Sequence, residues 1–77
     1  MTRAEILLAV TAEVDRAKSL HPRWPSDIIH AVAIVAEESG EAVKASLDAV
    51  YFDKPMEEVR KELIQTAATC FRALESL

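Results

Sequence analysis

The segment Tyr51-Phe52-Asp53-Lys54-Pro55 decides the fold of this 77-residue chain. The whole sequence contains one glycine and three prolines, so few positions can interrupt a helix. Asp53 or Lys54 is expected to cap a helix that has Pro55 in its first turn. A break of only a few residues between two long helices predicts that they fold back on each other as an antiparallel hairpin.

The helices on both sides of this break are predicted to be long. The one before it is expected to begin near Ser26 or Asp27, both of which are good N-caps, and to end near Phe52. The one after it runs to the C-terminus, and Cys70 is expected to be one of its core residues. Its apolar residues fall on one face: Met56, Val59, Leu63, Ala67, Cys70, Phe71 and Leu74.

A third predicted helix precedes these two. Thr2 and Glu5 have the spacing of a capping box, so this helix is expected to run from about Arg3 to about Ser19. Two prolines within residues 20–26 end it. Its apolar residues lie within one arc: Ile6, Leu7, Val10, Val14 and Ala17. The sequence shows no strand alternation and no repeat, so residues 1–77 are predicted to form one all-α domain.

The composition predicts a protein that associates with itself. A chain this short buries only ~60% of the surface that its unfolded state exposes, which leaves a thin core. Yet 51% of its residues are apolar. We therefore expect a helical bundle completed by oligomerisation, in which part of the apolar surface is buried against another copy of the chain.

Charge and hydropathy exclude two classes of partner. Acidic residues outnumber basic ones by 13 to 9, and no basic run is present, so no nucleic-acid partner is expected. The longest uncharged stretch, Ile28 to Ala36, is less than half the ~20 residues that span a bilayer, so no membrane partner is expected either. A single cysteine and a charged N-terminal segment predict a cytoplasmic protein.

Glu38 is the residue that tells most about function. Its neighbours three, four and seven positions away along the helix are apolar except for Glu41. The apolar ones are Ala31, Ile34, Val35, Ala42 and Ala45. Burying an unpaired carboxylate costs free energy, so Glu38 is expected to be protonated, paired or bound to a cation.

Two more glutamates are expected to lie near Glu38. Glu41 follows one turn later, a spacing that points two side chains at a common target. Counting outward from the break at ~1.5 Å per residue places Glu41 opposite Gln65, and Glu62 opposite Lys44. Carboxylates gathered in this way favour Mg²⁺, which takes oxygen ligands and joins carboxylates to phosphates.

The same residues have a second interpretation. Glu37, Glu41, Lys44 and Asp48 also match an ordinary solvated face, on which Lys44 supports the helix through an ion pair with Glu41 or Asp48. Spacing alone leaves both interpretations open.

Two motifs on these helices resemble those of a known family. Ala36-Glu37-Glu38-Ser39-Gly40-Glu41-Ala42 and Arg60-Lys61-Glu62-Leu63-Ile64-Gln65-Thr66-Ala67-Ala68 look like the MazG-like all-α nucleoside triphosphate pyrophosphohydrolases. The signature of that family is Glu-Glu-x-x-Glu on one helix and Glu-x-x-Asp on the next. The segment His21-Pro22-Arg23-Trp24-Pro25 is similar to that of small phage-type members, and the resemblance covers about residues 20 to 74.

The resemblance implies an activity and a set of ligands. The reaction is hydrolysis of a nucleoside triphosphate to the monophosphate and pyrophosphate, with Mg²⁺ or Mn²⁺, in a dimer or tetramer. By position, Glu38, Glu41 and Glu62 match metal ligands of the family. Gln65 stands where the family has aspartate. Its amide oxygen can still coordinate a metal, but the loss of one negative charge should weaken the site.

Other residues are expected to act on the nucleotide. Glu37 or Glu41 would orient the attacking water, and Lys44 would neutralise charge that develops on the phosphates. Trp24 would stack on the nucleobase. The alternative for Trp24 is that it fills the gap between the first and second helices.

A metal-dependent nucleotide pyrophosphohydrolase is therefore the expected function. Two alternatives stay open. One is an enzyme like phosphoribosyl-ATP pyrophosphatase, which shares the helical-bundle plan. The other is a non-catalytic dimeric interaction module that keeps the fold without the activity, and Gln65 favours it.

Overall fold

The computed structural model describes all 77 residues and consists of three helices. They are α1 (Arg3–Leu20), α2 (Ile28–Tyr51) and α3 (Met56–Glu75). No strand is present, which confirms the prediction of an all-α chain with three helices. None of the three is long and apolar enough to cross a membrane.

The N-termini of α1 and α2 are capped by side chains. Thr2 and Glu5 form the predicted capping box: the amide of Glu5 donates to Thr2 Oγ1 over 3.1 Å, and the amide of Thr2 donates to Glu5 Oε1 over 2.8 Å. At α2 the cap is Asp27, whose carboxylate accepts from the amide of His30 over 3.1 Å. These bonds satisfy amides that have no partner inside the helix.

The N-terminus of α3 differs from the prediction. Its N-cap is Pro55, which is extended and makes no side-chain cap, so neither Asp53 nor Lys54 has that role. Asp53 instead adopts a left-handed conformation, with φ of 54°, at the end of α2. The amide of Lys54 then returns to the carbonyl of Asp48 over 3.2 Å. Asp53 and Lys54, which were expected to cap the N-terminus of α3, therefore help to end α2.

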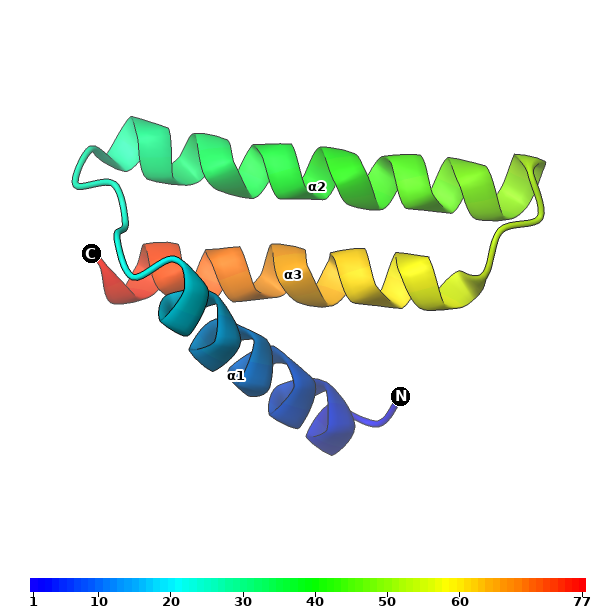
Figure 1. The fold of residues 1–77 in the computed structure, drawn as a ribbon, viewed down its shortest axis with the longest axis horizontal. Helices are drawn as coiled ribbons and strands as arrows, with labels where there is room; N and C mark the ends of the chain where they lie inside the picture. The colour runs from blue at the N-terminus through cyan, green and yellow to red at the C-terminus, as the bar shows by residue number, and fades with distance from the viewer.

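α3 is the central element of the fold. α2 and α3 lie side by side, and the chain reverses direction between them (Figure 1). α1 packs across the C-terminal part of α3 and diverges from it toward the N-terminus of the chain (Figure 1). No Cα atom of α1 lies within 8 Å of a Cα atom of α2, so each of these helices packs mainly on α3.

The core is as thin as the chain length predicts. Val10 and Val14 of α1 pack on Ala68 of α3, with Ile64 and Ala67 beside them. Only six residues are buried in the whole chain. Cys70, which was expected in the core, is half-buried. Several other residues of the predicted inward faces are exposed: Ile6, Leu7, Met56, Leu63, Phe71 and Leu74.

The one glycine of the chain lies in the middle of α2. Gly40 has no positive φ, and a Cβ added to it would meet nothing within 4 Å. Glycine inside a helix costs about 0.5–1 kcal/mol relative to alanine. Within a single chain, no contact explains why this position carries glycine.

Candidate metal centre

Three glutamates from two helices converge at the middle of the α2–α3 pair. α2 carries Glu38 and Glu41 one turn apart, and α3 carries Glu62. One carboxylate oxygen of each lies within 4.8 Å of the other two. Glu38 and Glu62 are half-buried, whereas Glu41 is exposed. The residues that sequence spacing predicted to gather are therefore close together in the structure.

The two half-buried glutamates have no partner for one of their oxygens. Oε2 of Glu38 and Oε2 of Glu62 are both shielded from solvent and accept no hydrogen bond. None of the ion pairs of the chain involves Glu38, Glu41 or Glu62. An ionised oxygen in this setting is costly unless a proton or a cation satisfies it.

The electrostatics of the cluster agree with its geometry. Burial is the main cause that raises the pKa of Glu38 above its usual value, and repulsion by Glu41 and Glu62 adds to it. Burial also raises the pKa of Glu62, again with repulsion by Glu41. Both shifts show that the folded protein disfavours the charged form when no cation is present.

The donor set fits a hard divalent cation. Mg²⁺ takes oxygen ligands, uses one or a few carboxylates and keeps several waters. The cluster offers carboxylate oxygens only, on two helices, and its exposed member Glu41 leaves a side open to solvent. The two unpartnered oxygens of Glu38 and Glu62 are the structural feature that a cation would satisfy.

A cavity of about 300 Å³ adjoins the cluster on the side of Trp24. Glu38 and Gln65 line it near the cluster, and Trp24 and Arg72 line it further away. The predicted ligand Gln65 is half-buried one turn after Glu62. The cavity thus connects Glu38 to the segment between α1 and α2.

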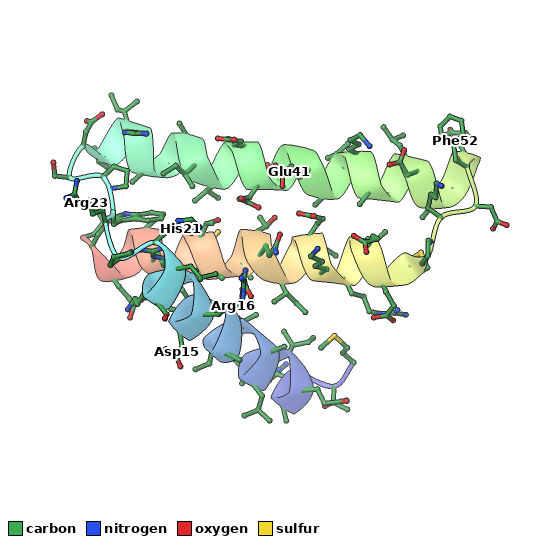
Figure 2. All side chains as sticks on the ribbon, viewed as in Figure 1. Asp15, Arg16, His21, Arg23, Glu41 and Phe52 are labelled. Carbon is green, nitrogen blue, oxygen red and sulfur yellow. The ribbon has the colours of Figure 1, made fainter.

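Trp24 packs on α3 and lines a cavity to which all three helices contribute residues. The Arg72 guanidinium lies over its ring, 4.8 Å from the ring centre. Arg72 also donates from Nη2 to the carbonyl of His21 over 2.8 Å, and it is only 8% exposed. Arg72 therefore holds residues 21–24 against α3. His21 and Arg23, which are labelled in Figure 2, belong to this segment.

Sequence analysis missed Arg72. Ile64, Ala68 and Arg72 follow one another at i, i+4 spacing, which places Arg72 on the face of α3 that packs against α1. This i, i+4 spacing could have predicted that Arg72 is buried. It was hidden because arginine is a residue type that is rarely buried.

A second cavity, of about 450 Å³, adjoins the cluster on the side of the α2–α3 turn. Glu41 and Glu62 line it together with Lys44 and Lys54. Lys44 Nζ lies 2.8 Å from Asp48 Oδ2, which is the ion pair of the solvated-face interpretation. Because the side chain of Lys44 is 77% exposed, solvent weakens this pair, and Lys44 can exchange partners at little cost.

Glu37 lies beside the cluster and outside the group of three. It is exposed, takes part in no ion pair, and contributes to the repulsion that raises the pKa of Glu38. Among the predicted site residues, the structure brings Glu38, Glu41 and Glu62 together. It places Lys44 on one side of them and Trp24 on the other.

Comparison with known proteins adds no relative to this picture. No family model, curated protein or solved structure matches the chain.

The raised pKa values predict how the metal-free protein responds to pH. The stability contributed by a group with a raised folded pKa is present below its unfolded pKa and is lost as pH rises through the folded pKa. In EDTA, the stability that protonated Glu38 contributes should therefore be lost as pH is raised from about the ordinary glutamate value of 4.5 to 8. Glu5 and Glu13 act in the opposite direction, because hydrogen bonds lower their pKa values, so the test is the difference between wild type and variant. Glu38→Gln should melt above wild type at pH 8 and level with it near pH 4.5.

The control for this experiment is Asp15→Asn, a change at an exposed acid of α1 (Figure 2). It should give no such gain at pH 8. A Glu38→Gln variant that melts below wild type at pH 8 in EDTA would show that the cluster is not under electrostatic strain.

Proposed function

We propose that this protein is a metal-dependent nucleotide pyrophosphohydrolase of the MazG-like type. It would hydrolyse a nucleoside triphosphate, with one water, to the monophosphate and pyrophosphate. The observation that carries this proposal is the convergence of three glutamates from two helices, with two buried oxygens that have no partner. The chain is acidic, with a net charge of −4, so a cation is needed for it to hold a triphosphate.

Glu38, Glu41 and Glu62 would hold Mg²⁺ or Mn²⁺, and the Gln65 amide oxygen is the candidate for a fourth ligand. When bound, the cation supplies charge neutralisation on the phosphates and polarisation of the reacting phosphorus. Glu37, or the exposed side of Glu41, would accept the proton of the attacking water. The leaving group is pyrophosphate, which departs as the bond between the first and second phosphates breaks.

The two cavities support one orientation of the nucleotide. The base would enter the cavity beside Trp24, and the phosphates would extend across the glutamates toward Lys44 and Lys54. Lys44 would leave its exposed pair with Asp48 to neutralise the phosphates. This orientation places the phosphates next to all three glutamates.

We also propose that oligomerisation completes the bundle. The hairpin of α2 and α3 would form half of a larger helical assembly, a dimer or a tetramer. Large apolar side chains remain exposed on every helix, and those of α2 are Ile28, Ile29, Val32, Val43, Leu47, Val50 and Tyr51. Exposed apolar surface of this extent is typical of a surface that another chain covers.

One observation favours a second candidate, a non-catalytic interaction module. Gln65 occupies the position at which a fourth carboxylate would be expected, so the site has one negative charge fewer for a metal. The extensive apolar surface fits a module of this kind equally well. The two candidates differ in whether the carboxylate cluster responds to metal.

Catalysis tests the main proposal directly. Wild-type protein with Mg²⁺ or Mn²⁺ should release pyrophosphate from at least one standard or modified nucleoside triphosphate. Glu38→Gln should lower kcat/KM by roughly 100-fold or more, since even a residue that only supports a metal ligand is worth ~10–100-fold. Asp15→Asn should keep full activity. A broad nucleotide panel that gives no turnover with either metal would favour the interaction module.

Gln65→Asp tests whether Gln65 belongs to the site. Without metal, a fourth carboxylate adds repulsion and should lower the melting temperature. With saturating Mg²⁺, each tenfold gain in affinity should return up to ~1.4 kcal/mol of stability. Melting curves of wild type and variant, in EDTA and in excess Mg²⁺, measure both effects. Equal shifts under the two conditions would place Gln65 outside the metal site.

Association is tested by mass. At micromolar concentration, light scattering should give at least twice the chain mass of 8.5 kDa. The physical reason is that the buried core of one chain is too small to support its three helices alone. A monomeric mass, together with full helicity and cooperative melting, would contradict this prediction.

A further inference from the structure

The outer side of α2 carries an apolar stripe on which nothing packs. Its residues follow one another at alternating spacings of four and three, the pattern of a coiled-coil seam. They are Ile29, Ala33, Ala36, Gly40, Val43, Leu47 and Val50, and all are exposed. The buried residues of α2 are Ala31 and Ala42, on its opposite side, and α3 is the one helix that contacts α2. A helix that is apolar on two sides requires a second neighbour.

The middle of this stripe is shaped for close approach. Ala33, Ala36 and Gly40 present almost no side chain, and large residues lie at both ends. Gly40 is the only glycine of the chain and is not needed by its own fold, because a Cβ there meets nothing within 4 Å. A helix backbone packed closely against this point would need the space that glycine leaves.

The stripe is also complementary to itself when one copy is reversed. After Ile29 at its N-terminal end come the small residues Ala33, Ala36 and Gly40, and the larger residues Val43, Leu47 and Val50 fill the C-terminal half. Two antiparallel copies that cross near Gly40 therefore place Val43 and Leu47 of one helix over Ala36 and Ala33 of the other, while Val50 of one meets Ile29 of the other at each end. A parallel pair would place small residues on small residues and leave a gap.

Charges beside the stripe favour the same direction. Glu37 and Lys44 are seven residues apart, so they flank the stripe on one side, three positions before Gly40 and four after it. Glu37 has no ion pair within its own chain. Reversing one helix about Gly40 brings Glu37 of each copy next to the partner's Lys44. In a parallel pair this flank would instead face the opposite flank of the partner helix, which carries Ser39 and Ser46, and these ion pairs would not form.

We infer that a second copy of this chain packs on the outer face of α2, with the two α2 helices antiparallel and crossing near Gly40. The inference rests on the proposed oligomerisation and specifies its interface. It is independent of whether the carboxylate cluster hydrolyses a nucleotide. Because Glu37 and Lys44 border both the stripe and the candidate site, the partner helix would also complete the outer rim of that site.

Distances between identical spin labels test the direction and the face. Single cysteines would replace Ile29, Val43 or Val50 in a Cys70→Ser background. At ~1.5 Å per residue, antiparallel helices that cross near Gly40 separate two labels at position 29 by about 30 Å, and two labels at position 50 likewise. Labels at position 43 should lie about 15 Å apart or closer. Short distances at both 29 and 50 would show a parallel pair, and a long distance at 43 would show another face.

Gly40→Leu tests the close approach. Leucine favours the helix more than glycine does, so helicity by circular dichroism should be kept or raised. The overpacked contact should weaken association by about tenfold or more, measured by sedimentation over a concentration series. The matched control is Ala12→Leu, a similar change at an exposed position of α1, which should leave association unchanged.

Each result decides the inference without reference to activity. Unchanged association in Gly40→Leu, an equal loss in Ala12→Leu, or a monomeric wild type would overturn it. Absence of nucleotide turnover would refute the proposed reaction and would leave these distance and association measurements valid.

Discussion

The turn at Asp53 is the constraint on which the rest of the molecule depends. Asp53, left-handed and directly after the C-cap of α2, and Pro55, extended two residues later, end one helix and begin the next within four residues. Because the connection is so short, it fixes which residues of α3 lie beside which residues of α2. Glu62, six residues into α3, then comes level with the middle of α2, where Glu38 and Glu41 lie. The carboxylate cluster is thus a consequence of loop length.

The cluster runs against the tendencies that stabilise the rest of the fold. A thin core can least tolerate half-buried acidic oxygens without partners, yet this chain places two of them within 4.8 Å of a third carboxylate. Local violations of this kind are typical of functional sites, where a ligand supplies the missing interaction. The caps of α1 and α2 and the Val10–Val14–Ala68 contact follow the ordinary rules and offset part of the cost.

Sequence reasoning reached the features that depend on local chemistry and on counting. The capping box at Thr2, the cap at Asp27 and the meeting of the three glutamates all follow from spacing along the chain. Features that depend on how helices cross could not be predicted in this way. Ile6 and Leu7 are exposed because α1 diverges from α3 toward the N-terminus of the chain. The spacing of apolar residues along the sequence does not determine the angle between the two helices. Pro55 was misplaced because propensity alone does not show that Asp53 is used to close α2.

The clamp formed by Arg72 has a consequence for experiments on this protein. The ring that Arg72 covers belongs to the only tryptophan in the chain. Fluorescence excited at wavelengths that only indole absorbs therefore comes entirely from Trp24, in the segment between α1 and α2. Any event that moves this segment away from α3, or that fills the cavity beside Glu38, changes the surroundings of a single fluorophore. The molecule carries an intrinsic optical probe at the junction of all three helices.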